Sequence, residues 1–139
     1  MISIAVDSGA CDNVINPNEL PAYEDMIVET QASRNGDDFV SASGDIIPNY
    51  GELKVMLVTR ERTARGMTFQ AAGVAKPLGS VKRMMQTNHR VVFDDTGSYI
   101  ENKHTGEVNL MREEDGNFML DVWVPPPTVA KAAGFHGQP

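Results

Sequence analysis

The chain has 139 residues, the size of one ordinary domain, and its 41% apolar and 22% charged residues are typical of a globular protein with a packed core. A formal charge of −7 and the lack of any Lys/Arg run argue against a nucleic-acid partner, because phosphate backbones attract clustered cations. No window approaches the roughly 20 consecutive apolar residues of a membrane-spanning helix, so we expect no membrane partner.

The chain has a single cysteine, Cys11, which cannot form an internal disulfide and supplies too few thiolates for a structural zinc site. We expect it to be a small buried apolar side chain in a reducing compartment, which predicts a cytoplasmic protein. The three histidines, at positions 89, 104 and 136, match no common metal-binding spacing. We therefore predict no metal and no cofactor.

Short, β-branched apolar runs bounded by Gly, Asn, Asp or Pro recur along the chain and predict a mainly β domain, closed or sandwiched. In chain order, strands are predicted at residues 2–6, 26–30, 39–41, 46–60 with a break near Pro48 and Gly51, 67–74, 90–93, 99–103, 107–112 and 118–124. Turn residues predict hairpins at positions 43–45, 64–66, 95–97, 105–106 and 115–117.

One helix is predicted, from Ser80 to Thr87, with Ser80 as its N-cap and Val81, Met84 and Met85 at helical spacing. After residue 124 three consecutive prolines favour an extended backbone, and the remaining residues show no periodicity. We therefore predict one domain over residues 1–124, followed by a Pro-rich linker or flexible tail over residues 125–139.

The clearest candidate for chemistry is Asp7, which follows the apolar run of residues 4–6. Ser8 offers a hydroxyl for bracing hydrogen bonds, Gly9 permits a tight turn, and Ala10 keeps the turn small. Acid catalysis of peptide cleavage needs two carboxylates around one water, one charged and one neutral. One chain supplies half of such a pair, so this chemistry requires a homodimer with Asp7 from each copy on the symmetry axis.

The pattern of residues 5–10, apolar-apolar-Asp-Ser-Gly-Ala, resembles the active-site signature of retroviral and retrotransposon aspartic proteases. Three later stretches are similar to the protease segment of copia-type retrotransposon polyproteins. They are residues 42–47 with 51–55, residues 69–75 with 77–81, and residues 91–93, 99–100 and 105–106 with 119–121. The resemblance covers about residues 2–124.

The resemblance implies a retropepsin-like closed β-barrel, the half-lobe of an acid protease, with one short helix beneath the catalytic turn. It implies an aspartic endopeptidase in which Asp7 is catalytic and Ser8, Gly9 and Ala10 form the active-site turn. Ser43, Gly44 and Asp45 would lie on a flap that closes over a peptide or polyprotein substrate. It further implies that the protein is a cytoplasmic homodimer that processes a polyprotein. Within the cell, the homodimer could also lie inside virus-like particles.

The sequence departs from this family before and after the aspartate. Only a few residues precede Asp7, whereas the family usually has another strand there that helps to form the dimer interface. Position 11 is cysteine where copia-type sequences more often have serine. Neither departure changes the catalytic carboxylate.

Other interpretations remain open. Residues 7–9 also fit a polar turn after an edge strand, and the whole domain fits a non-catalytic module for dimerisation or peptide binding, or a fragment of a larger assembly. A second Asp-Thr-Gly, at residues 95–97, we interpret as a hairpin turn, because the chain after Asp95 is too short for a second lobe with its own flap and helix.

Overall fold

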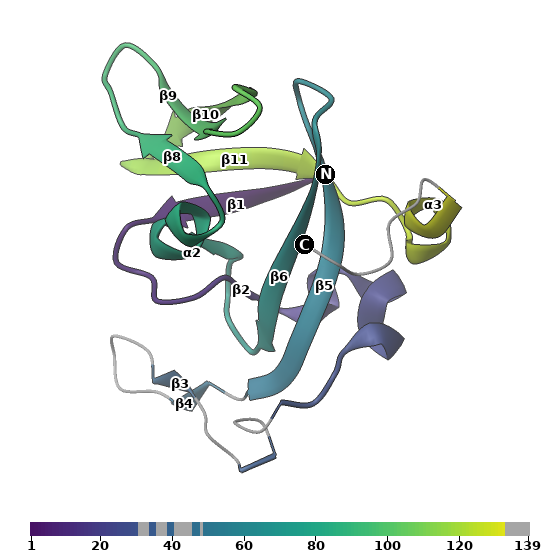
Figure 1. The fold of residues 1–139 in the computed structure, drawn as a ribbon. Helices are drawn as coiled ribbons and strands as arrows, with labels where there is room; N and C mark the ends of the chain where they lie inside the picture. Colours follow the sequence, from purple (N-terminus) through teal and green to yellow (C-terminus); the bar gives the residue numbers. More distant parts are fainter. Residues whose placement is uncertain (31–33, 36–38, 41–45, 48, 133–139) are drawn as a thin grey trace.

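The computed structural model describes residues 1–30, 34–35, 39–40, 46–47 and 49–132. Within these ranges the chain is mainly β (Figure 1). Its strands are β1 (Ile2–Asp7), β2 (Val14–Ile15), β3 (Phe39–Val40), β4 (Ile46–Ile47), β5 (Asn49–Thr59), β6 (Ala64–Ala72), β7 (Leu78–Ser80), β8 (His89–Val92), β9 (Ser98–Asn102), β10 (Val108–Glu114) and β11 (Asn117–Trp123). Its helical segments are η1 (Pro17–Glu19), η2 (Pro21–Met26), α2 (Val81–Gln86) and α3 (Pro127–Ala132).

Six strands close into a barrel in the order β1, β7, β2, β6, β5, β11, because β11 also pairs with β1. Val122 is at the junction, since it lies opposite Ile2 on one side and opposite Thr59 on the other. The expected closed β-sheet is therefore present. From β11 the sheet continues outward through β10, β9 and β8, and Figure 1 shows β9 and β10 above β11, at the end of the molecule opposite to β3 and β4.

The barrel is filled by residues that alternate along its strands. In β5 the buried positions from Gly51 onward are every second residue, which directs Leu53, Val55 and Leu57 inward. They meet Ile4 and Val6 of β1, Phe69 of β6, and Leu120 and Val122 of β11 in one core cluster. Because β1 contributes to this core, the backbone that leads to Asp7 is fixed by packing on one face.

Most predicted strands form with ends shifted by one to three residues, and the helix forms where it was expected, with the Ser80 hydroxyl accepting a hydrogen bond from the Arg83 N–H as N-cap. Two predictions are wrong. Residues 26–30 make only an isolated bridge between Val28 and Glu52, because η2 takes up the chain as far as Met26. Residues 64–66 lie inside β6 and do not form a turn; the hairpin turn comes earlier, at residues 60–63.

Part of the segment expected to be a linker packs onto the domain. The Tyr23 hydroxyl donates to the carbonyl oxygen of Pro125 at 2.7 Å, and Ala130 of α3 is buried. The three prolines explain this difference, because proline is well suited to the first turn of a helix and Pro127 begins α3. The last part of the predicted tail, residues 133–139, lies outside the described residues.

Candidate functional site

Asp7 is the last residue of β1, and its side chain is exposed at the end of a strand whose preceding residue, Val6, is buried. Its carboxylate Oδ1 accepts a hydrogen bond from the Gly9 N–H at 2.7 Å. A Cβ at position 9 would lie 3.3 Å from that same oxygen, which is tighter than an ordinary contact. A side chain at position 9 would press on the carboxylate, which agrees with the small residue expected in this turn, and Ser8 is exposed beside it.

Strand β7 lies between the two strands that the Asp7 turn connects. It runs parallel to β1, with Asp7 opposite Ser80, and antiparallel to β2, with Leu78 opposite Val14. The turn over residues 8–13 therefore crosses the end of β7 and comes next to the start of α2. This arrangement places the carboxylate at an end of the barrel where three strands meet.

Two buried polar side chains attach this turn to its neighbours. Asn13 accepts a hydrogen bond from the Ser80 N–H at 2.8 Å and donates to the Thr68 carbonyl oxygen at 3.1 Å. The Ser80 hydroxyl donates to the Ala10 carbonyl oxygen at 2.8 Å. Because both side chains are buried, these bonds are shielded from competing water and fix the turn against β6 and α2.

An ion pair on the surface adds to this attachment. Arg83 of α2 lies 3.2 Å from the Asp12 carboxylate. Cys11, next to it, is exposed, so the expectation of a buried thiol is wrong: Asn13 is the buried side chain of this turn, and position 11 faces outward. The roles of Asn13 and Arg83 were not foreseen from the sequence, since only the folded chain brings residues of the turn to β6 and α2.

The surface beside Asp7 is hollowed. A cavity of about 450 Å³ is bounded by Asp7 and Ser8, by Leu78 of β7, and by two aromatic residues. These are Phe93, which follows β8, and Phe118 of β11, whose ring centroids are 4.8 Å apart and inclined by 49°. The sequence predicted both phenylalanines as strand residues and did not predict their place beside Asp7.

Other predicted site residues are placed as follows. The flap residues Ser43, Gly44 and Asp45 lie outside the described residues. The second Asp-Thr-Gly forms the turn between β8 and β9, as predicted, with the Gly97 N–H donating to the Asp94 carbonyl oxygen at 3.2 Å.

Among the described residues no three His, Cys, Asp or Glu side chains are grouped to hold a metal ion. None of the described helices has the length and apolar character needed to cross a membrane.

Comparison of the chain with protein-family models, with curated proteins and with solved structures found no match. The arguments about function therefore depend on the residues and their geometry, together with the resemblance that the sequence itself shows.

Proposed function

We propose that the protein is an aspartic endopeptidase of the retroviral and retrotransposon type, with Asp7 as its catalytic residue, acting as a homodimer on a peptide or polyprotein. The observation that carries this proposal is the Asp7 turn. An exposed carboxylate stands at the end of a buried strand, is oriented by the Gly9 N–H, and is attached to the barrel by Asn13 and Ser80. A simple surface turn does not need that much buried support.

The chemistry follows from bringing two such turns together on a two-fold axis. Like charges at close range repel, so one Asp7 carboxylate keeps a proton while the other is ionised. The ionised carboxylate takes a proton from the water between them as the water oxygen attacks the peptide carbonyl carbon. The protonated carboxylate gives its proton to the carbonyl oxygen, and the tetrahedral intermediate then breaks the C–N bond as the amine nitrogen gains a proton.

The hollow beside Asp7 fits a peptide substrate. The peptide would bind in an extended form, as an added strand, and one of its apolar side chains would enter the hollow against Phe93 and Phe118. The exposed Ser8 next to the carboxylate leaves space for the peptide backbone. The flap over residues 43–45 remains part of the proposal from sequence alone.

The test is cleavage of a peptide library by the purified protein and by Asp7→Asn, which preserves the shape of the side chain and removes its charge. We expect activity with a maximum at mildly acidic pH, and a loss of roughly a thousandfold or more in Asp7→Asn. Asp25→Asn, an exposed aspartate in η2, is the matched control and should keep full activity. Equal cleavage by the wild type and Asp7→Asn would disprove the proposal.

The alternative is a non-catalytic module that keeps this fold for dimerisation or peptide binding. It is consistent with a single chain in which Asp7 is open to solvent. The two functions separate in the same experiment, because a module binds peptides from the library without cleaving them, and Asp7→Asn leaves that binding unchanged.

A further inference from the structure

A second cavity lies between α2 and β6. It shares no lining residue with the hollow at Asp7. Its volume is about 280 Å³, just below the ~300–1,000 Å³ of typical small-molecule sites. Most of its wall is apolar and comes from Leu57, Met67, Met84, Ile100 and Leu120. Two of these are methionines, whose flexible side chains adapt to ligands of different shape.

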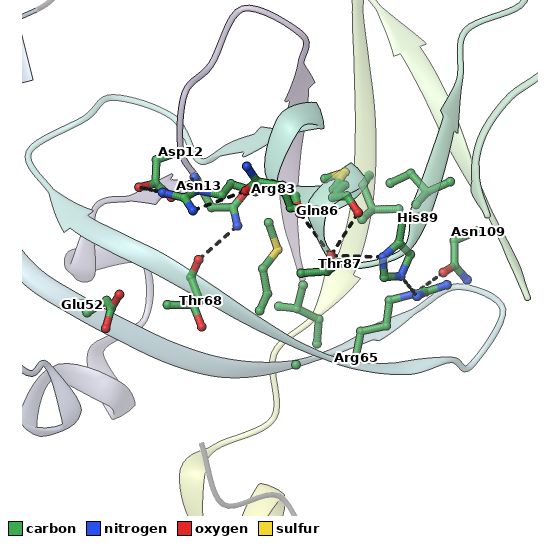
Figure 2. Close-up of a pocket in the computed structure, with 16 residues that line it drawn as sticks. Asp12, Asn13, Glu52, Arg65, Thr68, Arg83, Gln86, Thr87, His89 and Asn109 are labelled. Atoms are coloured by element: carbon green, nitrogen blue, oxygen red, sulfur yellow. Dashed lines mark hydrogen bonds and ion pairs between the residues drawn. The ribbon is translucent and has the colours of Figure 1, made fainter. Parts of the chain in front are cut away.

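One end of this cavity is cationic. Figure 2 shows Arg65 of β6 directed toward His89 of β8 and Asn109 of β10. The Arg65 Nε donates to the Asn109 Oδ1, and its Nη1 bonds to the His89 Nε2, both at 2.6 Å. The third nitrogen, Nη2, is buried and has no hydrogen-bond partner within the part of the chain that the structure describes. Leaving a buried charged donor without an acceptor is costly, so this nitrogen marks an incomplete set of contacts.

Both groups that Arg65 contacts are neutral. Burial and the nearby Arg65 charge lower the pKa of His89, and its other ring nitrogen lies 3.2 Å from the Thr87 hydroxyl. A neutral imidazole that donates to Thr87 through Nδ1 accepts from Arg65 through Nε2, which agrees with the observed pairing. Glu61 and Glu107 act on Arg65 through their charge, yet among the described residues no carboxylate is in ion-pair contact with it.

The opposite end of the cavity holds the acidic side chains Asp12 and Glu52, as Figure 2 shows. Asp12 is already paired with Arg83. An anion in the cavity is therefore drawn to the Arg65 end and away from Glu52, which gives a ligand one orientation. The apolar wall lies between the two ends.

We propose that this cavity binds a small organic monocarboxylate, with its carboxylate against Arg65 and its hydrocarbon part against Met67, Met84 and Ile100. Arg65 lines the cavity, and a carboxylate held there would meet a guanidinium that no carboxylate among the described residues contacts as an ion pair. Guanidinium and carboxylate match in geometry and form strong charge-assisted hydrogen bonds. This site does not depend on the proposed peptidase activity, since it shares neither Asp7 nor the hollow beside it.

The test is an amide NMR titration of the full chain at neutral pH with three probes of equal length: hexanoate, hexan-1-ol and hexylamine. We expect saturable shifts around α2 and β6 with hexanoate, and affinity for the alcohol and the amine weaker by roughly tenfold or more. Arg65→Met should abolish the preference for the carboxylate. Arg90→Met removes an exposed arginine of β8 outside the cavity and should leave hexanoate binding unchanged.

A further variant, Met84→Trp, fills the cavity from the partly exposed helix and should prevent binding of all three probes. Equal affinity for hexanoate and hexan-1-ol would overturn the proposal, as would hexanoate binding that survives in Met84→Trp or an absence of saturable shifts. If Arg65→Met does not fold, the comparison of the three probes on the wild type, together with Met84→Trp, decides the question in the same terms.

Discussion

At the scale of single residues, the Asp7 turn depends on side chains that do not carry out chemistry themselves. Asn13 is the clearest example, because its amide bonds both to the Ser80 N–H and to the Thr68 carbonyl oxygen from a buried position. Replacing it removes both of these bonds at once. The position of the carboxylate then depends on Ser80 and the surface ion pair.

We predict that Asn13→Ala lowers the free energy of unfolding by about 1–3 kcal/mol, because the buried Ser80 N–H and Thr68 carbonyl oxygen lose their acceptor and donor. Urea denaturation measures this change. Asn18→Ala, an exposed asparagine in η1, is the control and should change stability little. A loss no greater than that of the control would show that the turn is held without Asn13.

A second residue, Asp121, controls how the barrel responds to acid. Arg112 bonds to both of its carboxylate oxygens, at 2.9 and 3.0 Å, and the Ser3 hydroxyl donates to one of them. These bonds lower the pKa of Asp121 from 3.8 to about 2, although burial opposes the shift. Since the pKa is depressed in the folded state, the resulting stability is present above about pH 4 and is lost as the pH falls toward 2.

We therefore predict that the free energy of unfolding of the wild type falls by on the order of 2 kcal/mol from this group between about pH 4 and pH 2. Asp121→Asn should be less stable than the wild type at neutral pH and should lose less stability over the same acid range. Urea denaturation at several pH values measures both. Parallel pH profiles for the wild type and Asp121→Asn would contradict the assignment.

At the scale of elements, the strand beside β1 comes from the end of the domain. The family that the sequence resembles usually has another strand before the one that leads to the aspartate, and in this chain β11 pairs with β1 from Ile2 to Val6. Because Ile2 lies opposite Val122, the start of β1 and the end of β11 are neighbours in an antiparallel pair. A short hairpin turn is enough to connect them.

This geometry predicts that a circular permutant will fold. In it Val122 is joined to Ile2 through an Asn-Gly turn, and new ends are opened at the exposed turn of residues 104–105. We expect the circular dichroism of a β domain and a cooperative thermal transition, at a lower temperature than in the wild type because α3 and the Tyr23 bond to Pro125 are absent. Deletion of β10 and β11 should instead give an unfolded chain, since Leu120 and Val122 leave the core. An unfolded permutant would contradict the inference that a short turn can connect the end of β11 to the start of β1.

The elements also show what the sequence can and cannot predict. Strong local signals were correct: the alternating β5, the helix capped by Ser80, and the Asp115-Gly116 turn, where both residues have positive φ. The very short strands β2 and β7 were missed, because two or three residues carry no period and pair only once the barrel exists. The same holds for the candidate site. Asp7 and Gly9 could be predicted because they belong to a local sequence pattern, whereas Phe118 comes close to the turn only through the pairing of β11 with β1.

At the scale of the whole molecule, the proposed function requires two copies, because one chain presents one Asp7. We predict that specific activity falls on dilution as the dimer dissociates, and that sedimentation equilibrium gives a dimer at the concentrations where cleavage is observed. Mixing the wild type with an excess of Asp7→Asn should suppress activity, since mixed dimers contain one functional aspartate. A strictly monomeric protein that remains active would contradict the shared site.

The pairing of β1 with β11 also bears on when the protein gains its shape during synthesis. Asp7 is made well before its neighbouring strand, because Asn117–Trp123 follows it by more than a hundred residues. Contacts so far apart in sequence form late, after most of the chain has been released. The strand that carries Asp7 therefore gains this partner only after β11 has been made, so we expect the Asp7 turn to reach its folded geometry late in the synthesis of the domain.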